Sequence, residues 1–258
     1  MIDNAAIVHS SCEVAETAII ERGAFIGKNC VIGDGVKVGY NAIIESNTTV
    51  GEGSVICANA HIGGDPQDYS FGGEDTKLII GKNCVVREFA TIHRACTKED
   101  VWETVVGDNC FIMAYAHVAH DCKLENNVTM TSFASFGGHC RVGSFVVAGG
   151  YAACHQFCRI GTGAMLGGRV NVSKDIPPFT MAAGIPAVIE GLNVVGLKRR
   201  GVKPDARLEL KKALKIYGDL NNKLAEVPAL LSELEQFDEI KIFKDFIVSD
   251  SLRSFTRR

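Results

Sequence analysis

The chain has 258 residues, 47% of them hydrophobic, and a formal net charge of −3. This length suits one core with room for a small second unit, and the weak net charge gives no field that would attract nucleic acid. The sequence has neither a basic segment followed by an apolar run at its start nor a stretch of about 18 apolar residues, so we expect no signal peptide, no membrane span and a cytoplasmic location.

A six-residue repeat begins almost at the first residue. Its units open on apolar residues from Val8 to Ile62, again from Ile80 to Ile92, and from Val106 to Val172. A period of six cannot keep one face of a helix apolar, whereas short strands separated by turns rich in Gly, Asn and Asp fit it well. With three units to a coil, residues 18 apart stack at the strand spacing of about 4.8 Å. The repeat therefore predicts a parallel β-helix.

Two segments interrupt the repeat. Residues 63–77 are polar and rich in glycine, and residues 97–105 contain the only tryptophan, Trp102. Loops of this length in a compact domain are usually functional or disordered.

The repeat ends at Pro177 and Pro178. Beyond it, apolar residues at helical spacing predict helices at about 204–217, 224–234 and 240–248. We therefore expect a β-helix over residues 1–190 and a small C-terminal α-helical domain over residues 191–258.

Ten cysteines would suggest disulfides or a metal site if their spacing were ignored. Eight of them occupy the fifth place of a unit, which points into the narrow prism: Cys12, Cys30, Cys84, Cys96, Cys110, Cys122, Cys140 and Cys158. Free cysteine packs as a small hydrophobe, so we interpret these as packing residues.

The repeat brings histidines together at one corner of the prism. Counting in steps of 18 places His120, Gly138 and Gln156 in one column, with Asp121 and His139 beside it. The unit at Ile92 lies three units before the one at Val118, so the same count adds His93 and His155 to this corner, while His117 sits on the preceding side of its coil. The four histidines placed on one face by arithmetic, His93, His120, His139 and His155, favour a site over solvated turn residues.

His120 and Asp121 are the candidate catalytic pair. Imidazole transfers protons near neutral pH, and a neighbouring carboxylate fixes its tautomer and raises its basicity. Gly138, directly above His120, would let a backbone N–H approach a developing oxyanion, although an ordinary turn glycine is an equal alternative. Zinc is a rival use of the histidines. The β-helix carbonic anhydrases have two metal-binding histidines five residues apart, whereas His117 and His120 are three apart, so we expect no metal.

Specific motifs extend along the whole chain. They are the Gln67-Asp68 loop, TIHR at 91–94, AHVAHDC at 116–122, GGHC at 137–140, HQF at 155–157 and GLNVVGLKRRG at 191–201. In these motifs the sequence resembles the UDP-N-acetylglucosamine 3-O-acyltransferase family, which begins lipid A synthesis in Gram-negative bacteria. The departures from the family pattern are Ser70, Val195 and Pro186.

The resemblance implies a left-handed coil and a homotrimer with active sites between subunits. It implies His120 as general base, Asp121 as its partner and Gly138 as oxyanion donor, with no metal or cofactor. The residues that it assigns to substrate binding are Asp68, His93, His117, His139, His155, Gln156, Asn193, Arg199 and Arg200. The implied reaction is direct transfer of an (R)-3-hydroxyacyl chain from acyl carrier protein to the 3-position of UDP-N-acetylglucosamine.

Two surface features complete the expectations. Lys211, Lys212 and Lys215 form a basic face suited to an acidic protein such as acyl carrier protein. The stacked third-place residues include Gly150 and Gly168, which we expect to floor part of the acyl groove. The alternatives left open are a coenzyme A-dependent acetyltransferase of the same repeat class, a zinc carbonic anhydrase-like β-helix and a structural β-helix.

Overall fold

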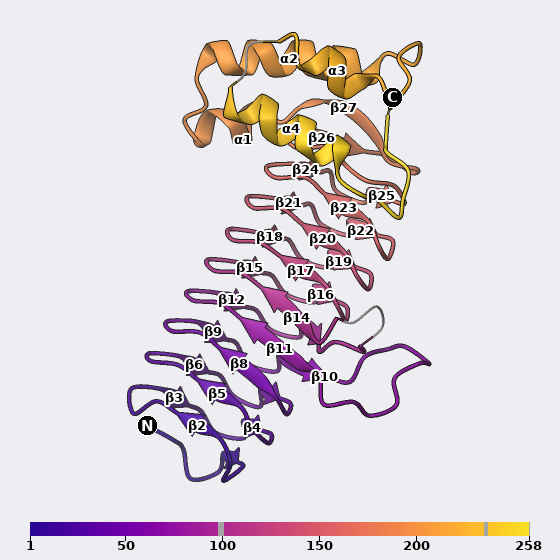
Figure 1. Cartoon of the computed structure of the whole chain (residues 1–258). Coiled ribbons are helices and arrows are strands. Elements are labelled where there is room, and N and C mark those ends of the chain that lie inside the picture. Colours follow the sequence, from indigo (N-terminus) through magenta and orange to yellow (C-terminus); the bar gives the residue numbers. More distant parts are fainter. Residues whose placement is uncertain (98–100, 235–236, 258) are drawn as a thin grey trace.

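The chain forms a left-handed parallel β-helix with helices at one end (Figure 1). The computed structural model describes residues 1–97, 101–234 and 237–257. Residues 98–100 of the predicted second loop, and residues 235–236 and 258 of the predicted helical domain, lie outside the described residues.

Three sheets make the three sides of the prism. Sheet 1 contains β1 (Ile7–Val8), β4 (Phe25–Ile26), β7 (Ile43–Ile44), β10 (His61–Gly64), β13 (Thr91–His93), β16 (His117–Val118), β19 (Ser135–Phe136), β22 (Ala153–Cys154) and β25 (Asn171–Val172). Sheet 2 contains β2 (Glu13–Val14), β5 (Val31–Ile32), β8 (Thr48–Val50), β11 (Lys77–Ile80), β14 (Glu103–Val106), β17 (Lys123–Leu124), β20 (Arg141–Val142) and β23 (Arg159–Ile160). Sheet 3 contains β3 (Ile19–Ile20), β6 (Lys37–Val38), β9 (Val55–Ile56), β12 (Val85–Val86), β15 (Phe111–Ile112), β18 (Thr129–Met130), β21 (Val147–Ala148), β24 (Met165–Leu166), β26 (Thr180–Ala183) and β27 (Val188–Leu192).

The predicted stacking is confirmed by the strand register. Val118 pairs with Phe136, which pairs with Cys154, each step being 18 residues. The register is the same on both sides of the second loop, because Ile92 before the loop pairs with Val118 after it. The first residue of each unit is the inward-facing one, and most of these isoleucines, valines and leucines are 0–2% exposed. Each such burial stabilises the fold by about 1.5–3 kcal/mol, so the apolar repeat itself holds the coils together.

The corners explain the asparagines of the repeat. Asn29, Asn47, Asn83, Asn109 and Asn127 all have φ between 53° and 62°. This left-handed conformation is costly for most side chains but tolerated by asparagine, whose amide can bond locally. The turn chemistry read from the sequence therefore produces the sharp corners.

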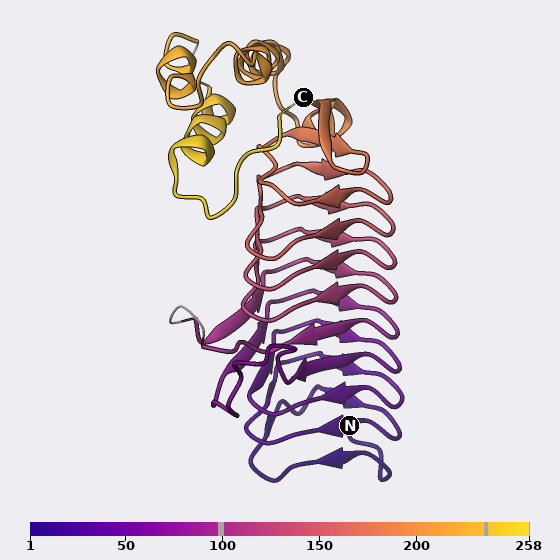
Figure 2. The same ribbon diagram turned by 90° about the vertical axis from the view of Figure 1, so that its right-hand side faces the viewer.

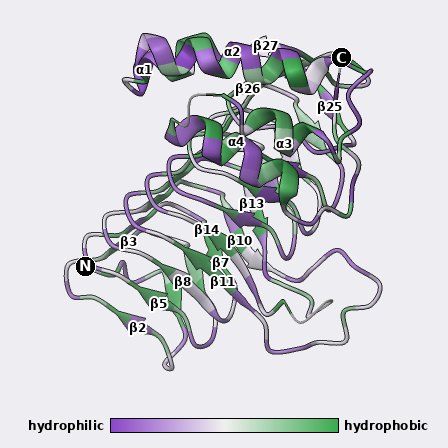
Figure 3. Ribbon diagram, turned by 45° about the horizontal axis from the view of Figure 1, so that its top comes forward, coloured by the Kyte–Doolittle hydropathy of each residue, from purple (hydrophilic) through white to green (hydrophobic). Residues whose placement is uncertain are grey.

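The prism closes with an antiparallel pair, β26 and β27, and four helices follow within the described part of the chain. These are α1 (Val194–Arg199), α2 (Pro204–Gly218), α3 (Val227–Leu231) and α4 (Asp238–Val248). The helices predicted at about 204–217 and 240–248 are confirmed, the one predicted at 224–234 is present but shorter, and α1 and the strand pair were not predicted. Helices α2 to α4 carry both hydrophilic and hydrophobic residues along their length (Figure 3) and bury Leu210, Tyr217 and Phe243 among them. The predicted division at residues 190 and 191 falls inside β27 and stays a prediction.

All ten cysteines are free. The predicted packing role is confirmed by burial for most fifth-place cysteines, but Cys12, in the first coil, is only partly buried. Cys96 is buried yet bonds a carboxylate, so its interpretation as a packing residue alone is wrong. Over the residues that the structure describes, none of the helices is long and apolar enough to span a bilayer.

Candidate active site

The corner between sheets 1 and 2 carries both loops and the histidine-bearing turns. We call the part of it between residues 93 and 157 the histidine corner. The loops leave the prism after β10 and β13, two successive strands of sheet 1. They project on the same side of the prism as helices α3 and α4 (Figure 2). The interruptions of the repeat and its histidines therefore lie together.

Gly138 stacks directly on His120. The backbone N–H of His139 donates to the carbonyl of His120 at 3.0 Å, and that of Phe157 donates to Gly138 at 2.9 Å. A Cβ on residue 138 would lie 2.6 Å from Cε1 of His120, so only glycine fits above this ring. Among the described residues, none accepts a hydrogen bond from the Gly138 N–H. This donor is therefore available to a ligand beside His120.

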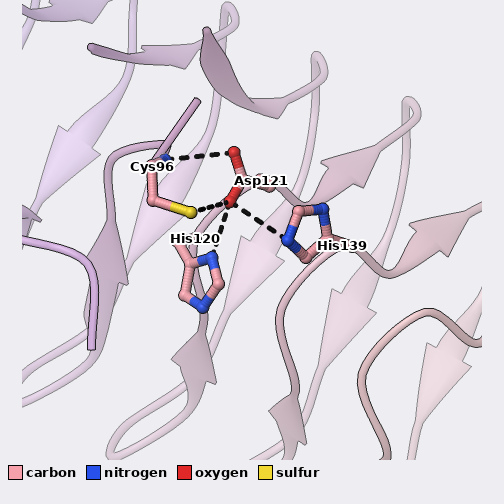
Figure 4. A group of neighbouring side chains, drawn as sticks. All are labelled: Cys96, His120, Asp121 and His139. Atoms are coloured by element: carbon pink, nitrogen blue, oxygen red, sulfur yellow. Dashed lines mark hydrogen bonds and ion pairs between the residues drawn. The ribbon is translucent and has the colours of Figure 1, made fainter. Parts of the chain in front are cut away.

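Asp121 is fully buried and surrounded by donors (Figure 4). Its Oδ2 lies 2.6 Å from Nδ1 of His120 and 3.4 Å from Nε2 of His139. The Asp121 N–H donates to Oγ1 of Thr104 at 2.8 Å, and the Asp121 carbonyl accepts from Arg141 at 2.5 Å. A carboxylate can only accept, so Nδ1 of His120 carries the proton and its Nε2 is free to act as a base.

Cys96 completes the environment of this carboxylate. Its N–H donates to Oδ1 at 3.1 Å, and its Sγ lies 3.1 Å from Oδ2. Burial alone would raise the pKa of the Asp121 carboxyl, but hydrogen bonds from His120 and Cys96 lower it below its usual value. Asp121 is therefore ionised at neutral pH and holds the ring of His120 in one orientation.

The same cluster contains side chains of the types that bind metal ions. Ligand-type atoms of Cys96, His120, Asp121 and His139 lie within 4.8 Å of one another. However, two atoms bound to one tetrahedral zinc ion would be about 3.3 Å apart at usual bond lengths. The 2.6 Å between His120 and Asp121 is shorter, which is the geometry of a hydrogen bond.

The first loop brings Asp68 close to the ring of His120. Asp68 Oδ2 lies 4.0 Å from Nε2 of His120. Its Oδ1 accepts from the backbone N–H and hydroxyl of Ser70, at 2.8 and 2.7 Å. Ser70, a departure from the family pattern, therefore orients the carboxylate. A cavity of about 400 Å³ lies beside this loop, lined by Pro66, Gln67, Asp68 and Tyr69.

The remaining predicted histidines line the same corner. His93 and His117 meet edge to face with centroids 5.0 Å apart, and Nδ1 of His117 bonds Oγ1 of Thr91 at 2.8 Å. Burial, and then the positive charge of neighbouring histidines, lowers the pKa of His93 to about 4. Burial also lowers the pKa of His117, with His120 adding to the shift. These rings are therefore neutral at pH 7.

His155 and Gln156 lie one coil above Gly138 and are exposed. Nδ1 of His155 bonds the guanidinium of Arg253 at 2.6 Å, and the carbonyl of Gln156 accepts from the same side chain at 3.0 Å. Arg253 belongs to the C-terminal segment, which pairs with Asp175 on the last coil. The structure thus brings Asp68, His93, His117, His139, His155 and Gln156 to the corner of His120.

Asn193 and Arg200 lie at a different corner, between sheets 2 and 3. Asn193 caps α1, accepting from Gly196 at 3.0 Å, and its amide donates to the carbonyl of Gly163 at 3.0 Å. The guanidinium of Arg200 lies 4.7 Å from the ring of Phe145, and burial lowers its pKa. Arg199, the preceding residue, is exposed. One chain therefore does not assemble all the predicted substrate residues.

Gly150 and Gly168 lie at the third corner, between sheets 3 and 1. A Cβ on either would meet nothing closer than 3.5 Å, and neither has a positive φ. The fold itself therefore does not require glycine there. Exposed aromatic rings stack beside them with centroids 4.7–5.0 Å apart: Phe89, Tyr115, Phe133 and Tyr151.

Sequence reasoning missed four contacts of the site, made by Cys96, Thr104, Arg141 and Arg253. The repeat placed Cys96 at the fifth position of a unit, as a packing residue, and gave no register for Thr104, which falls within the predicted second loop. Arg141 lies in the coil after Asp121. Because an arginine side chain is long and flexible, the repeat does not predict which group it bonds. A separate cleft of about 570 Å³, between sheet 2 and α4, includes Arg141 and Arg159 but no predicted site residue. Chemistry therefore identifies the site better than cavity size.

Comparison with known sequences identifies both parts of the chain. Residues 175–256 match the family described as Udp N-acetylglucosamine O-acyltransferase, domain 2. Residues 29–64 and 103–138 match the bacterial transferase hexapeptide repeat. A curated relative from Thermodesulfovibrio yellowstonii, an acyl-(acyl-carrier-protein)-UDP-N-acetylglucosamine O-acyltransferase, is 51% identical over 187 residues, or 72% of each chain.

Solved structures agree over the full length. The UDP-N-acetylglucosamine acyltransferase from Campylobacter jejuni is 36% identical, with a TM-score of 0.93 and 100% of both chains covered. The UDP-N-acetylglucosamine O-acyltransferase from Moraxella catarrhalis is 32% identical, with a TM-score of 0.94 and 99% of both chains covered. The likeness therefore includes the helical end as well as the prism.

Proposed function

The chain belongs to the acyl-(acyl-carrier-protein)-UDP-N-acetylglucosamine O-acyltransferase family, and on this premise we propose that His120 is its general base. The proposed reaction moves an (R)-3-hydroxyacyl chain from acyl carrier protein to the 3-position of UDP-N-acetylglucosamine. The observation that carries the proposal is the bond between Nδ1 of His120 and buried Asp121, which leaves Nε2 facing the corner as an acceptor.

The proposed mechanism is direct attack. Nε2 of His120 removes the proton of the sugar 3-hydroxyl as its oxygen attacks the thioester carbonyl. The imidazolium is stabilised by Asp121, while the N–H of Gly138 donates to the oxyanion. Collapse of this intermediate breaks the carbon–sulfur bond, and the proton on His120 passes to the leaving thiolate. Atoms balance without a metal ion or bound cofactor, so activity should survive dialysis against EDTA.

Substrate binding is assigned to the residues around this pair. Asp68, 4.0 Å from Nε2 of His120, is placed to accept a sugar hydroxyl. We assign His93, His117 and His139 to the sugar and acyl groups, and His155 and Gln156 to the nucleotide. Neutral imidazoles at the corner suit this role, because their N–H groups donate without adding charge.

A homotrimer with active sites between subunits is supported by the separation of the predicted residues. Asn193 and Arg200 lie at another corner from His120, so a neighbouring subunit would have to supply them and Arg199 to the same nucleotide. The outward residues of sheet 3 offer an apolar surface for such a contact: Val55, Val85, Phe111, Val147 and Met165. Acyl carrier protein, UDP-N-acetylglucosamine and a cytoplasmic location complete the proposal.

The acyl groove is proposed along Gly150 and Gly168. The fold does not require glycine at these two positions, which supports a role in contacting a ligand or a neighbouring subunit. The stacked aromatic rings beside them add apolar surface for a hydrocarbon chain.

The deciding experiment measures acyl transfer by the purified protein and its His120→Ala variant. The wild type should acylate UDP-N-acetylglucosamine from (R)-3-hydroxyacyl carrier protein and should not use acetyl coenzyme A. His120→Ala should lose about 10²- to 10⁴-fold in kcat. His9→Ala, a change of an exposed histidine in the first coil, is the matched control and should be fully active. More than half of the wild-type rate in His120→Ala at pH 7 would remove His120 from the role.

A further inference from the structure

Cys96 differs from the other cysteines at the same place of the repeat. In the neighbouring coils, the thiols of Cys84, Cys110, Cys122 and Cys140 point to backbone carbonyls, at 3.0–3.3 Å. The thiol of Cys96 instead lies 3.1 Å from Oδ2 of Asp121, the oxygen that also receives Nδ1–H of His120. Its place next to the second loop, where the regular coil is interrupted, permits this contact.

The carboxylate is held on both oxygens. The Cys96 N–H bonds Oδ1, and the thiol bonds Oδ2. Asp121 is 0% exposed and Cys96 is 2% exposed, so water cannot replace a lost donor. In such surroundings a hydrogen bond to a charged group has a larger effect than at a surface.

We propose that the thiol of Cys96 is a positioning group for acyl transfer, fixing the Asp121 carboxylate that orients His120. The inference rests on the proposed function of His120 as base. The S–H donates to Oδ2 and draws off part of its negative charge. Without it, the carboxylate would gain rotational freedom and bind the imidazolium form of His120 more strongly. His120 would then hold its proton to higher pH, and less of it would be the neutral base at pH 7.

Among the residues that the structure describes, the other charged or titratable groups that face this pair come from several elements and remain in every variant. They are Asp68 from the first loop, His93 from β13, His117 from β16, His139 from the turn after β19, and Arg141 from β20. Because Cys96→Ala leaves these groups and the residue 96 N–H in place, a shift of the pH profile would report the thiol alone.

The test compares Cys96→Ala and Cys96→Val, which lack the donor, with Cys96→Ser, which keeps one. Cys110→Ala removes a buried thiol from the same place of a neighbouring unit and serves as the control. The donor-free variants should lose about fivefold in kcat, the factor equivalent to about 1 kcal/mol, with an unchanged KM for UDP-N-acetylglucosamine. The acidic limb of their kcat profile should move to higher pH. Cys96→Ser and Cys110→Ala should keep the wild-type limb.

Two kinetic outcomes would overturn the proposal. Wild-type kcat and pH profile in folded Cys96→Ala or Cys96→Val would show that the thiol is not needed. Equal loss in Cys96→Ser and Cys96→Ala would reduce Cys96 to a packing role. A direct readout separates this proposal from the proposed function. Proton NMR of wild type should show a downfield Nδ1–H resonance of His120, which Cys96→Ala shifts and Cys96→Ser retains, whether or not acyl transfer occurs. An unshifted resonance in Cys96→Ala would also overturn the proposal.

Discussion

Arg253 donates a hydrogen bond to Nδ1 of His155 across 98 residues of sequence, at 2.6 Å. A guanidinium has no acceptor, so Nδ1 must present its lone pair and Nε2 must carry the ring proton. In this tautomer His155 can only donate from its outer nitrogen, so the C-terminal segment fixes the direction of that hydrogen bond. An N–H donor of this kind suits a phosphate or carbonyl oxygen of the nucleotide sugar.

Removing this contact should weaken substrate binding. Arg253→Met keeps most of the side-chain volume but loses the donor, and we expect a rise of about five- to tenfold in KM for UDP-N-acetylglucosamine. The kcat should change little, and Arg253→Lys should be milder. Arg257→Met is the control, because Arg257 anchors the same segment through the carbonyls of Tyr217 and Asn222. An equal KM rise in both would assign the effect to docking of the segment instead.

The stacking of the site could be predicted from the sequence because the length of the repeat determines which residues lie above one another. A fixed period of 18 residues places His120 under Gly138 without any knowledge of side-chain contacts, and the register resumes after the second loop. The contact of Cys96 with Asp121 could not be predicted in this way, because it depends on the path of an irregular segment. Arg253 was missed for a similar reason. The position of Arg253 depends on the pairing of the C-terminal segment with Asp175, and no local sequence pattern predicts this pairing.

The corner of neutral histidines should make stability depend on pH. The pKa of His93 in the folded chain is about 4, below its ordinary value of 6.5. Between these two pH values the unfolded chain therefore binds a proton at His93 and the folded chain does not. Stability is therefore complete above pH 6.5 and falls as the pH drops toward 4. We expect a loss of about 1–2 kcal/mol from this group between pH 7 and pH 5. Thermal unfolding of His93→Gln should show a shallower fall over this range, and identical slopes would contradict the assignment.

The basic face of α2 should recruit acyl carrier protein. Lys211 and Lys215 are exposed, whereas Lys212 pairs with buried Glu209 at 2.5 Å. The cleaner change is therefore Lys211→Glu with Lys215→Glu. Rim charges act mainly on association, so kcat/KM for acyl carrier protein should fall about tenfold at low salt and converge with wild type at high salt. Arg22→Glu with Lys28→Glu, at exposed turns of the first coils, should have no effect. A salt dependence that is unchanged in the α2 variant would rule out this docking face.

The length of the acyl chain should be set at Gly168. This residue is exposed, and a Cβ there would meet only the carbonyl of Gly150, at 3.5 Å, so the folded chain accepts a side chain at this place. Gly168→Met should therefore fold normally while its side chain fills part of the proposed groove. Obstructing an apolar groove costs about 1–3 kcal/mol, which is enough to exclude the methylenes beyond the obstruction. Competition among (R)-3-hydroxyacyl donors of graded length should show a shorter optimum, with binding of UDP-N-acetylglucosamine unchanged. Ala58→Met occupies the same place of the repeat near the other end of the prism and should keep the wild-type optimum. The same optimum in folded Gly168→Met would put the end of the acyl chain elsewhere.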